Sequence, residues 1–442
     1  MNLTLLKNAK IVNENSIFEA DLRINKGRIE HIEKHLSAQP NEQVIDLQGD
    51  WLLPGMIDDQ VHFREPGLEW KANIASESRA AVAGGITSYM EMPNVNPATT
   101  NHAALRHKRD IAAANSLANY AFYLGATPDN LDQIKACDPK TVCGVKVFMG
   151  ASTGDLLVEH PAALEAIFKE CPTLIATHCE KGDIIANNLK GLANRPLTIH
   201  DHPIIRDVEA CYASSSYAVN LAKKYNSDLH VLHITTAKEL ALFEAGPIDN
   251  KHITAEACVH HLWFNQDDYT RLGNLIKCNP AIKSEHDRLA LLNALNDGRI
   301  DIIATDHAPH TWQEKQVPYC DAPAGLPLVQ HALLSLFDQV KRGALTIEQV
   351  VEKTAHNPAK RFKINERGFI REGYFADLTV VSCSASEAVT HDNSHYHCAW
   401  SPFAGHQFSH SICYTFVNGQ CVYNHGDIID DTKSAMPLIF NR

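Results

Sequence analysis

Residues 54–67 read PGMIDDQVHFREPG and contain a run of strand length, residues 56–62, that ends on a histidine. Seven further runs of strand length follow, at residues 86–92, 120–125, 144–148, 174–178, 229–233, 253–258 and 300–305. Helical patterns separate them, for example at residues 76–83, 162–171, 208–225 and 236–245. Eight buried strands that are each followed by a helix are typical of a (β/α)8 barrel. We therefore predict an α/β fold built on a TIM-type barrel.

The two ends of the chain have a different pattern. The first fifty residues contain short strands of alternating apolar and polar residues, separated by Asn-rich and Gly-containing turns. The same pattern occurs after Gly368, where it includes a hairpin about Asn418-Gly419. A helix that starts at Thr346, with a capping box between Thr346 and Gln349, leads back into this second piece. We predict that residues 1–53 and 362–442 form one composite β-sandwich domain and that residues 54–361 form the barrel.

Composition limits the class of protein. The chain has 442 residues with 40 Lys and Arg against 52 Asp and Glu, so its formal net charge is −12. This acidic balance, without any basic run, argues against nucleic acid and membrane surfaces as partners. The twelve cysteines are scattered without a C-x-x-C pair, and the first residues contain no uninterrupted apolar segment. We therefore expect a cytoplasmic protein with reduced cysteines.

Polar side chains with metal-binding atoms lie at equivalent ends of five predicted strands. They are His62, Lys146, His178, His233 and Asp306. Any one of them alone is more often an ordinary loop residue, but one barrel mouth would gather all five. Imidazole nitrogens and carboxylate oxygens suit Zn²⁺ or a similar divalent ion. The sequence therefore predicts a metal site at the carboxyl ends of the strands.

Lys146 needs a separate interpretation because its neighbours Val145, Val147 and Phe148 are apolar. A charged ammonium group inside a barrel is penalised by desolvation. Either the side chain reaches solvent, or burial favours the neutral amine, which can take up CO₂ to form a carbamate that bridges two cations.

The motifs PGMIDDQVHFREPG, AAVAGGIT, MPNVNP, GVKVFMG, THCE, HVLHIT, ATDHAPH and GYFADLTVV occur in this order over nearly the whole chain. Together they resemble the amidohydrolase superfamily and, within it, the longer, class I-like form of dihydroorotase. The resemblance implies reversible cyclisation of N-carbamoyl-L-aspartate to L-dihydroorotate in de novo pyrimidine biosynthesis, at a centre of one or two zinc ions.

By matching position, the resemblance implies a role for each site residue. The metal ligands would be His62, N-carboxylated Lys146, His178, His233 and Asp306, and Asp306 would also act as general base and acid toward a metal-bound hydroxide. Arg64, Asn94 and His310 would hold the substrate carboxylate and ring, and the backbone of Gly325 would touch the substrate. These roles suit the chemistry, because an arginine can bind a carboxylate through two hydrogen bonds and a metal ion can activate water.

One position departs from the family pattern. Gln60 stands where the family has the first histidine of a His-x-His pair, and an amide oxygen is a weaker zinc ligand than imidazole. The second ion is therefore in doubt, and Gln60 is a doubtful ligand. Asp59 would be a substitute only by turning from the opposite face of its strand. His260 and His261 are interpreted as structural.

Several alternatives stay open. The chain could instead be a related cyclic amidohydrolase, an allantoinase or a dihydropyrimidinase, although Arg64 and the Pro93-Asn94 pair favour an acidic ring. It could also be a catalytically silent homologue that serves as a structural partner of aspartate transcarbamoylase. We expect the chain to form a homo-oligomer, a dimer. The loop at residues 311–327 is long for a barrel connection and is either a lid or substrate wall, or simple irregular packing.

Overall fold

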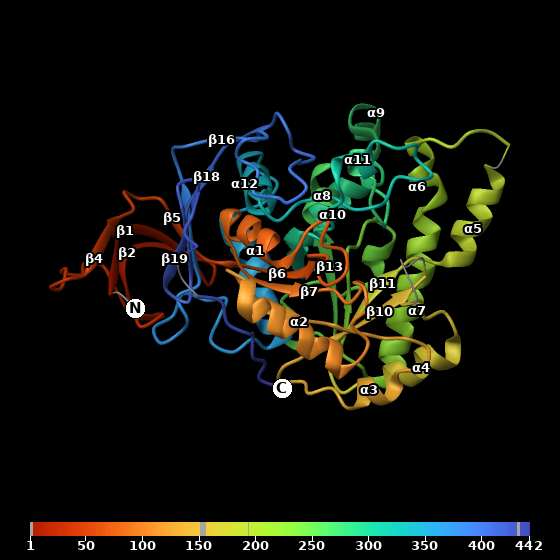
Figure 1. Cartoon of the computed structure of the whole chain (residues 1–442), viewed down its shortest axis with the longest axis horizontal. Coiled ribbons are helices and arrows are strands. Elements are labelled where there is room, and N and C mark those ends of the chain that lie inside the picture. Colours follow the sequence, from red (N-terminus) through yellow and green to blue (C-terminus); the bar gives the residue numbers. More distant parts are fainter. Residues whose placement is uncertain (1–2, 151–155, 193, 431–433) are drawn as a thin grey trace.

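The computed structural model describes residues 3–150, 156–192, 194–430 and 434–442 (Figure 1). Its centre is a ring of parallel strands: β6 (Met56–Val61), β7 (Ile86–Glu91), β8 (Asn119–Phe122), β9 (Leu124–Gly125), β10 (Val145–Met149), β11 (Ile175–Cys179), β12 (Leu229–Val231), β13 (Ile253–Cys258) and β14 (Ile302–Ala304). The third predicted strand is divided at Tyr123 into β8 and β9. The ring closes where His62 N donates to His307 O over 2.7 Å, beside a parallel bridge from Val61 to His307. The predicted TIM-type barrel is confirmed.

Helices cover the outside of this ring, as Figure 1 shows for α1, α2, α4 and α7. The longer ones are α1 (Ile74–Ala83), α2 (His102–Asn115), α4 (Pro161–Glu170), α5 (Gly182–Gly191), α7 (Val208–Tyr225), α10 (Glu285–Asp297) and α12 (Ala332–Lys341). The shorter ones are α3 (Leu131–Lys135), α6 (His202–Ile205), α8 (Val259–Trp263), α9 (Tyr269–Leu272), α11 (Trp312–Lys315), α13 (Ile347–Val351) and α14 (Asn357–Phe362). The capping box at Thr346 and Gln349 opens α13 as predicted.

The helix predicted over residues 236–245 is wrong, because only a 3-10 turn forms there, Glu239–Leu242. Side-chain contacts explain the difference. Asp287 accepts the N–H of Ala237 over 2.9 Å, and the buried Glu239 carboxylate accepts the hydroxyl of Thr236 over 2.8 Å. These tertiary and local hydrogen bonds compete with a continuous helical ladder.

Strands from both ends of the chain form one β-rich domain at one end of the molecule, where the sequence predicts a composite β-sandwich (Figure 1). They are β1 (Thr4–Asn13), β2 (Ser16–Asn25), β3 (Arg28–Glu33), β4 (Gln43–Asp46), β5 (Trp51–Pro54), β15 (Leu378–Ser382), β18 (Ser411–Val417), β19 (Gln420–Asn424) and β20 (Asp427–Ile428), and β16 (Glu387–Ala388) pairs separately with β17 (Gln407–Phe408). The nine strands form one hydrogen-bonded sheet because β1 pairs with β2, β4 and β5, and β5 pairs with β15 from the other end of the chain. The hairpin at Asn418 and Gly419 is present, with φ values of 48° and 73°.

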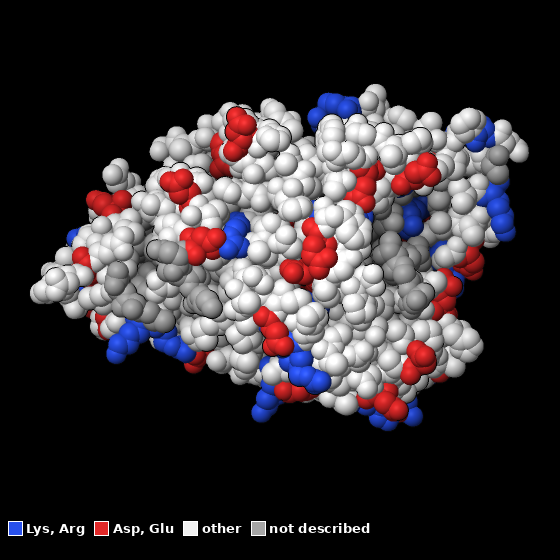
Figure 2. Space-filling model, viewed as in Figure 1, with Lys and Arg blue, Asp and Glu red and all other residues white. Residues whose placement is uncertain are grey.

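The exact borders of the two domains stay a proposal, residues 1–53 with 362–442 and residues 54–361. Residues 1–2 and 431–433 of the first unit, and residues 151–155 and 193 of the second, lie outside the described residues. Among the described helices, none is long and apolar enough to cross a membrane. On the face in Figure 2, acidic and basic side chains are interspersed.

Candidate active site

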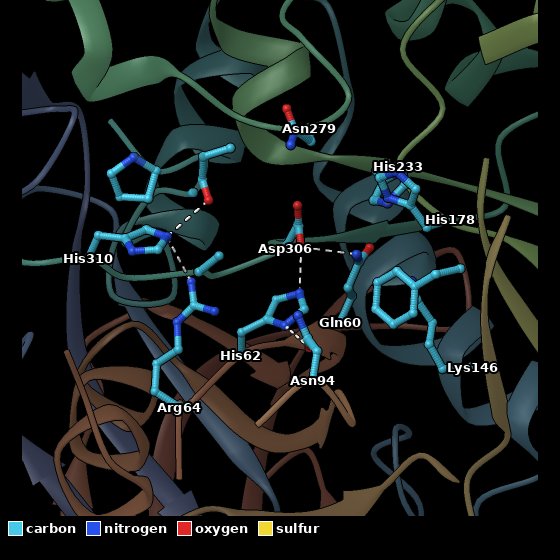
Figure 3. Close-up of a pocket in the computed structure, with 15 residues that line it drawn as sticks. Gln60, His62, Arg64, Asn94, Lys146, His178, His233, Asn279, Asp306 and His310 are labelled. Carbon is cyan, nitrogen blue, oxygen red and sulfur yellow. Dashed lines mark hydrogen bonds and ion pairs between the residues drawn. The ribbon is translucent and has the colours of Figure 1, made fainter. Parts of the chain in front are cut away.

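A cavity opens at the carboxyl ends of the barrel strands, and every predicted site residue lines it (Figure 3). These residues are Gln60, His62, Arg64, Asn94, Lys146, His178, His233, Asp306, His310 and Gly325. The barrel brings them together because parallel strands place their carboxyl ends at one mouth. The structure thus gathers in one cavity residues that lie up to 265 positions apart, from Gln60 to Gly325 (325 − 60 = 265).

Three of these residues have left-handed backbone conformations. Residues other than glycine adopt such conformations at an energetic cost. The φ angles are 70° at Arg64, 41° at His233 and 50° at Asp306. At His233 the N–H donates to the Glu256 carboxylate over 3.0 Å, which supports this conformation. Such turns at strand ends redirect the side chains into the cavity.

His62 and Asp306 form one close contact between predicted ligands. His62 Nδ1 lies 2.7 Å from the Asn94 side-chain oxygen, and His62 Nε2 lies 3.1 Å from Asp306 Oδ1. Burial lowers the pKa of His62, so its neutral form is favoured. With its proton on Nδ1, facing Asn94, the ring directs a lone pair from Nε2 at a carboxylate oxygen. The Nε2 lone pair of His62 and the Asp306 carboxylate oxygen thus face each other as two acceptors, which suits them to bind one cation between them.

The carboxylate of Asp306 stays ionised in this setting. Burial alone would raise the pKa of Asp306, but its contacts with neighbouring groups, His62 first among them, hold it below its ordinary value. Gln60 Nε2 also donates to Asp306 Oδ1, over 3.0 Å, and Gln60 Oε1 lies 3.9 Å from Cys258 Sγ. Gln60 therefore presents its amide nitrogen to Asp306 in this structure, and its carbonyl oxygen faces the thiol.

His178 and His233 form a second pair of facing ring nitrogens. His178 Nδ1 lies 3.0 Å from His233 Nε2, and the pKa values of both side chains are lowered by burial. The other nitrogen of His178 lies 3.1 Å from Glu180 Oε2, and Arg206 pairs with the same carboxylate oxygen. Glu180 therefore orients His178. The sequence places Glu180 in the THCE motif, but it does not indicate this contact.

Lys146 projects into the cavity from β10 and is only 1% exposed. Its Nζ lies 4.8 Å from the ring centroid of Phe148, and it forms no ion pair with any carboxylate in the described part of the chain. Burial lowers the pKa of Lys146 to about 8. The interpretation in which this side chain reaches solvent is therefore wrong, because the barrel mouth encloses the ammonium group.

Arg64 lies at the opposite side of the cavity from Lys146 (Figure 3). Its Nε donates to Pro309 O over 3.0 Å, and its terminal nitrogen lies 3.1 Å from His310 Nε2. Lys71 donates to His310 Nδ1 over 2.9 Å, so the proton of the neutral ring is on Nε2, which donates to Ala324 O over 2.9 Å. His310 thus offers Arg64 no acceptor. Across the described residues Arg64 also has no carboxylate partner, so its terminal N–H groups are available to an anionic ligand.

Sequence reasoning missed several residues at this cavity. Asn279 lines it, and its buried side-chain oxygen has no hydrogen-bond partner among the described residues. Phe148, Ala308, Pro323 and Ala324 complete the lining. The only sequence signal for Asn279 is that an Asn-Pro pair follows the seventh strand, which is also typical of an ordinary turn.

Two other groups of side chains that could hold a metal ion lie outside the cavity lining. Asp59, His230 and Glu256 form one, with His230 Nε2 3.1 Å from Asp59 Oδ2, and Cys258, His260 and His261 form the other. Asp59 is thus turned away from the cavity, as the alternation along its strand predicts. His260 and His261 are buried in α8 and do not line the cavity, which is compatible with their structural interpretation.

Known proteins are similar to this chain over most of its length. Residues 51–422 match the family model described as the Amidohydrolase family. A dihydroorotase of Halobacterium salinarum is 34% identical over 389 residues, which cover 87% of this chain and 89% of that protein. An allantoinase of Solibacter usitatus is 30% identical over 444 residues, which cover 97% of this chain and 95% of that protein.

A solved structure shares the fold. The L-hydantoinase (dihydropyrimidinase) of Arthrobacter aurescens is 25% identical, with a TM-score of 0.93 over 99% of this chain and 100% of that chain. The resemblance stated from the motifs and the prediction of a hydrolytic enzyme are therefore confirmed. The chain belongs to the Amidohydrolase family.

Proposed function

We propose that the protein is a dihydroorotase that interconverts N-carbamoyl-L-aspartate and L-dihydroorotate. The observation that carries this proposal is the guanidinium of Arg64. It is only 7% exposed, it faces the cavity, and the described residues offer it no carboxylate. A buried cation without a partner is costly, and an acidic ring would supply the missing carboxylate. A neutral ring would not.

The donor set at the cavity fits a zinc centre. His62 Nε2 faces Asp306 Oδ1, and His178 Nδ1 faces His233 Nε2, so lone pairs converge at two places. We propose His62, His178, His233 and Asp306 as ligands, with Lys146 as a carbamate, since its lowered pKa favours the amine that takes up CO₂. When bound, a zinc ion lowers the pKa of a water molecule and polarises an amide carbonyl. One or two ions per chain fit this proposal, and Gln60 makes the second site the weaker one.

Asp306 is the proposed general base and acid. Its Oδ1 accepts a hydrogen bond from Gln60 and faces His62 Nε2, whereas its Oδ2 makes no hydrogen bond among the described residues. Oδ2 is therefore the atom that can take a proton from the attacking water and return it to the ring nitrogen that leaves. The lowered pKa of Asp306 keeps it ready to accept this proton.

The remaining lining residues are proposed to orient the ring. Arg64 binds its carboxylate, and the backbone of Gly325 forms a wall against it. Asn94 uses its oxygen for His62, so its amide N–H₂ group is left for a substrate oxygen. The unpartnered oxygen of Asn279 can accept a ring N–H, which adds one contact to the set expected from the sequence.

Three further parts of the proposal concern context. The reaction belongs to de novo pyrimidine biosynthesis in the cytoplasm. The protein assembles as a homodimer, and it associates with aspartate transcarbamoylase if that enzyme is present. We do not favour a catalytically silent homologue, because the potential ligands and Asp306 all converge in one cavity.

Allantoinase or dihydropyrimidinase activity is the main alternative, since relatives with these names share the fold. Turnover of dihydroorotate, allantoin and dihydrouracil, followed by ultraviolet absorbance on protein of known metal content, separates the candidates. We expect turnover of dihydroorotate to exceed that of allantoin and of dihydrouracil. Preferred turnover of allantoin or dihydrouracil would refute the proposal, and no turnover of any substrate by zinc-loaded protein would favour the silent homologue.

A further inference from the structure

Two buried lysines support the loop at residues 311–327, Lys315 from within the loop and Lys277 from outside it. Lys315 is 1% exposed and Lys277 is 8% exposed. Neither forms an ion pair with a carboxylate in the part of the chain that the structure describes. Lysines are seldom buried without an acidic partner, because desolvation of the ammonium group is costly. Both side chains therefore need another explanation.

The ammonium group of Lys315 is surrounded by backbone carbonyls. Its Nζ donates to Pro323 O over 2.9 Å, to Gly325 O over 3.0 Å and to Lys277 O over 3.2 Å. Three acceptors match the three donors of an ammonium group. Two of these carbonyls belong to the segment that lines the cavity, and the third belongs to the segment that leads to Asn279.

Lys277 makes a similar set of contacts from the other side of the loop. Its Nζ donates to Tyr319 O over 2.7 Å and to Ala322 O over 2.5 Å. Its own carbonyl accepts the N–H of Gly325 over 2.8 Å as well as the ammonium group of Lys315. Four hydrogen bonds thus join the loop to Lys277, and two more, from Lys315 to Pro323 O and Gly325 O, hold the loop to itself.

These contacts bear directly on the cavity. Pro323, Ala324 and Gly325 form one of its walls, and Ala324 O fixes His310. The wall is tightly packed, since a Cβ atom at Gly325 would lie 2.3 Å from Ala308 O. Neither lysine lines the cavity, so neither is placed to bind the substrate itself.

We propose that Lys277 and Lys315 are positioning residues that hold the 323–325 wall in its binding geometry. The loop at residues 311–327 is then a fixed wall of the cavity and not a lid. The contact of this wall with substrate rests on the proposed function, whereas the rigidity of the wall does not.

Hydrogen exchange measured by mass spectrometry tests the proposal without any substrate. In the natural protein, amides at residues 318–325 should exchange as slowly as those of the neighbouring barrel strand β13. In Lys315→Met, which keeps a side chain of similar length but has no donors, they should exchange at least 10-fold faster, with β13 unchanged. Gln316→Met is the matched control, because Gln316 is exposed in the same loop and its side chain makes no hydrogen bond among the described residues.

Kinetics give a second readout on whichever ring the enzyme hydrolyses. Lys315→Met should raise KM by about 10-fold with a smaller change in kcat, since the wall binds the ring and does not move protons. Lys277→Met provides the same test if the first variant does not fold. Rapid exchange of residues 318–325 in the natural protein, or unchanged exchange in a folded variant, would overturn the proposal. Failure to hydrolyse dihydroorotate would overturn only the proposed function.

Discussion

Substitution of Arg64 by lysine should separate an acidic ring from a neutral one. The guanidinium is 7% exposed and can give a carboxylate two hydrogen bonds, while its Nε is already engaged with Pro309 O. Lysine keeps the charge but has a single flexible ammonium group. A hydrogen bond to a charged group contributes about 1.5–3 kcal/mol, so the loss of one should lower kcat/KM for dihydroorotate about 10- to 100-fold.

The assay compares dihydroorotate with dihydrouracil, which has no carboxylate, at equal metal content. Any residual turnover of dihydrouracil should be nearly unchanged in Arg64→Lys, and the bound metal should be the same as in the natural protein. Arg79→Lys is the control, because Arg79 pairs with the exposed Asp430 on the outside of the barrel. Unaltered kinetics with dihydroorotate would remove Arg64 from the binding site, and an equal loss with both rings would show that the side chain only supports the fold.

Three other substitutions test the proposed centre. Asp306→Asn should lower kcat about 10²- to 10⁴-fold, because the amide cannot accept the proton; normal turnover by metal-loaded protein would reject the acid–base role. Gln60→His should tighten the weaker metal site in a calorimetric zinc titration, and two equal sites in the natural protein with no change on substitution would exclude Gln60 from the ligands. Glu180→Gln should weaken zinc affinity about 10- to 100-fold through the orientation of His178. Unchanged affinity in this last variant would show that Arg206 and the backbone suffice to hold the ring.

The barrel could be predicted from the sequence because its strands are buried on both faces and appear as short apolar runs. The position of the mouth follows from the same pattern, since each run has a defined carboxyl end. The helix at residues 236–245 could not be predicted correctly, because Asp287, which accepts the N–H of Ala237, lies 50 residues away in the chain. Local propensity cannot include a competitor that only the fold brings into contact.

The contacts within the site also depend on neighbours that only the fold brings together. The sequence indicates that His62, His178 and His310 lie at the mouth, but not which atom faces which neighbour. Asn94, Glu180 and Lys71 each fix the orientation of one of these rings. Asn94 and Lys71 come from other strand ends or loops than the rings they contact, so the spacing of residues along one strand does not indicate them. Orientation of a ring determines which nitrogen has the lone pair, and therefore whether it can bind a metal ion.

The neighbours of Gln60 limit how a second metal site could be completed. Asp58 is held by Thr305, whose hydroxyl donates to Asp58 Oδ2 over 2.6 Å, and Asp59 is paired with His230. Both carboxylates are fully buried, so turning either one into the cavity would leave Thr305 or a buried imidazole without its partner. Of the side chains on β6, only Gln60 lines the cavity. A stronger ligand at this strand must therefore come from substitution at position 60, and not from rotation of a neighbouring aspartate.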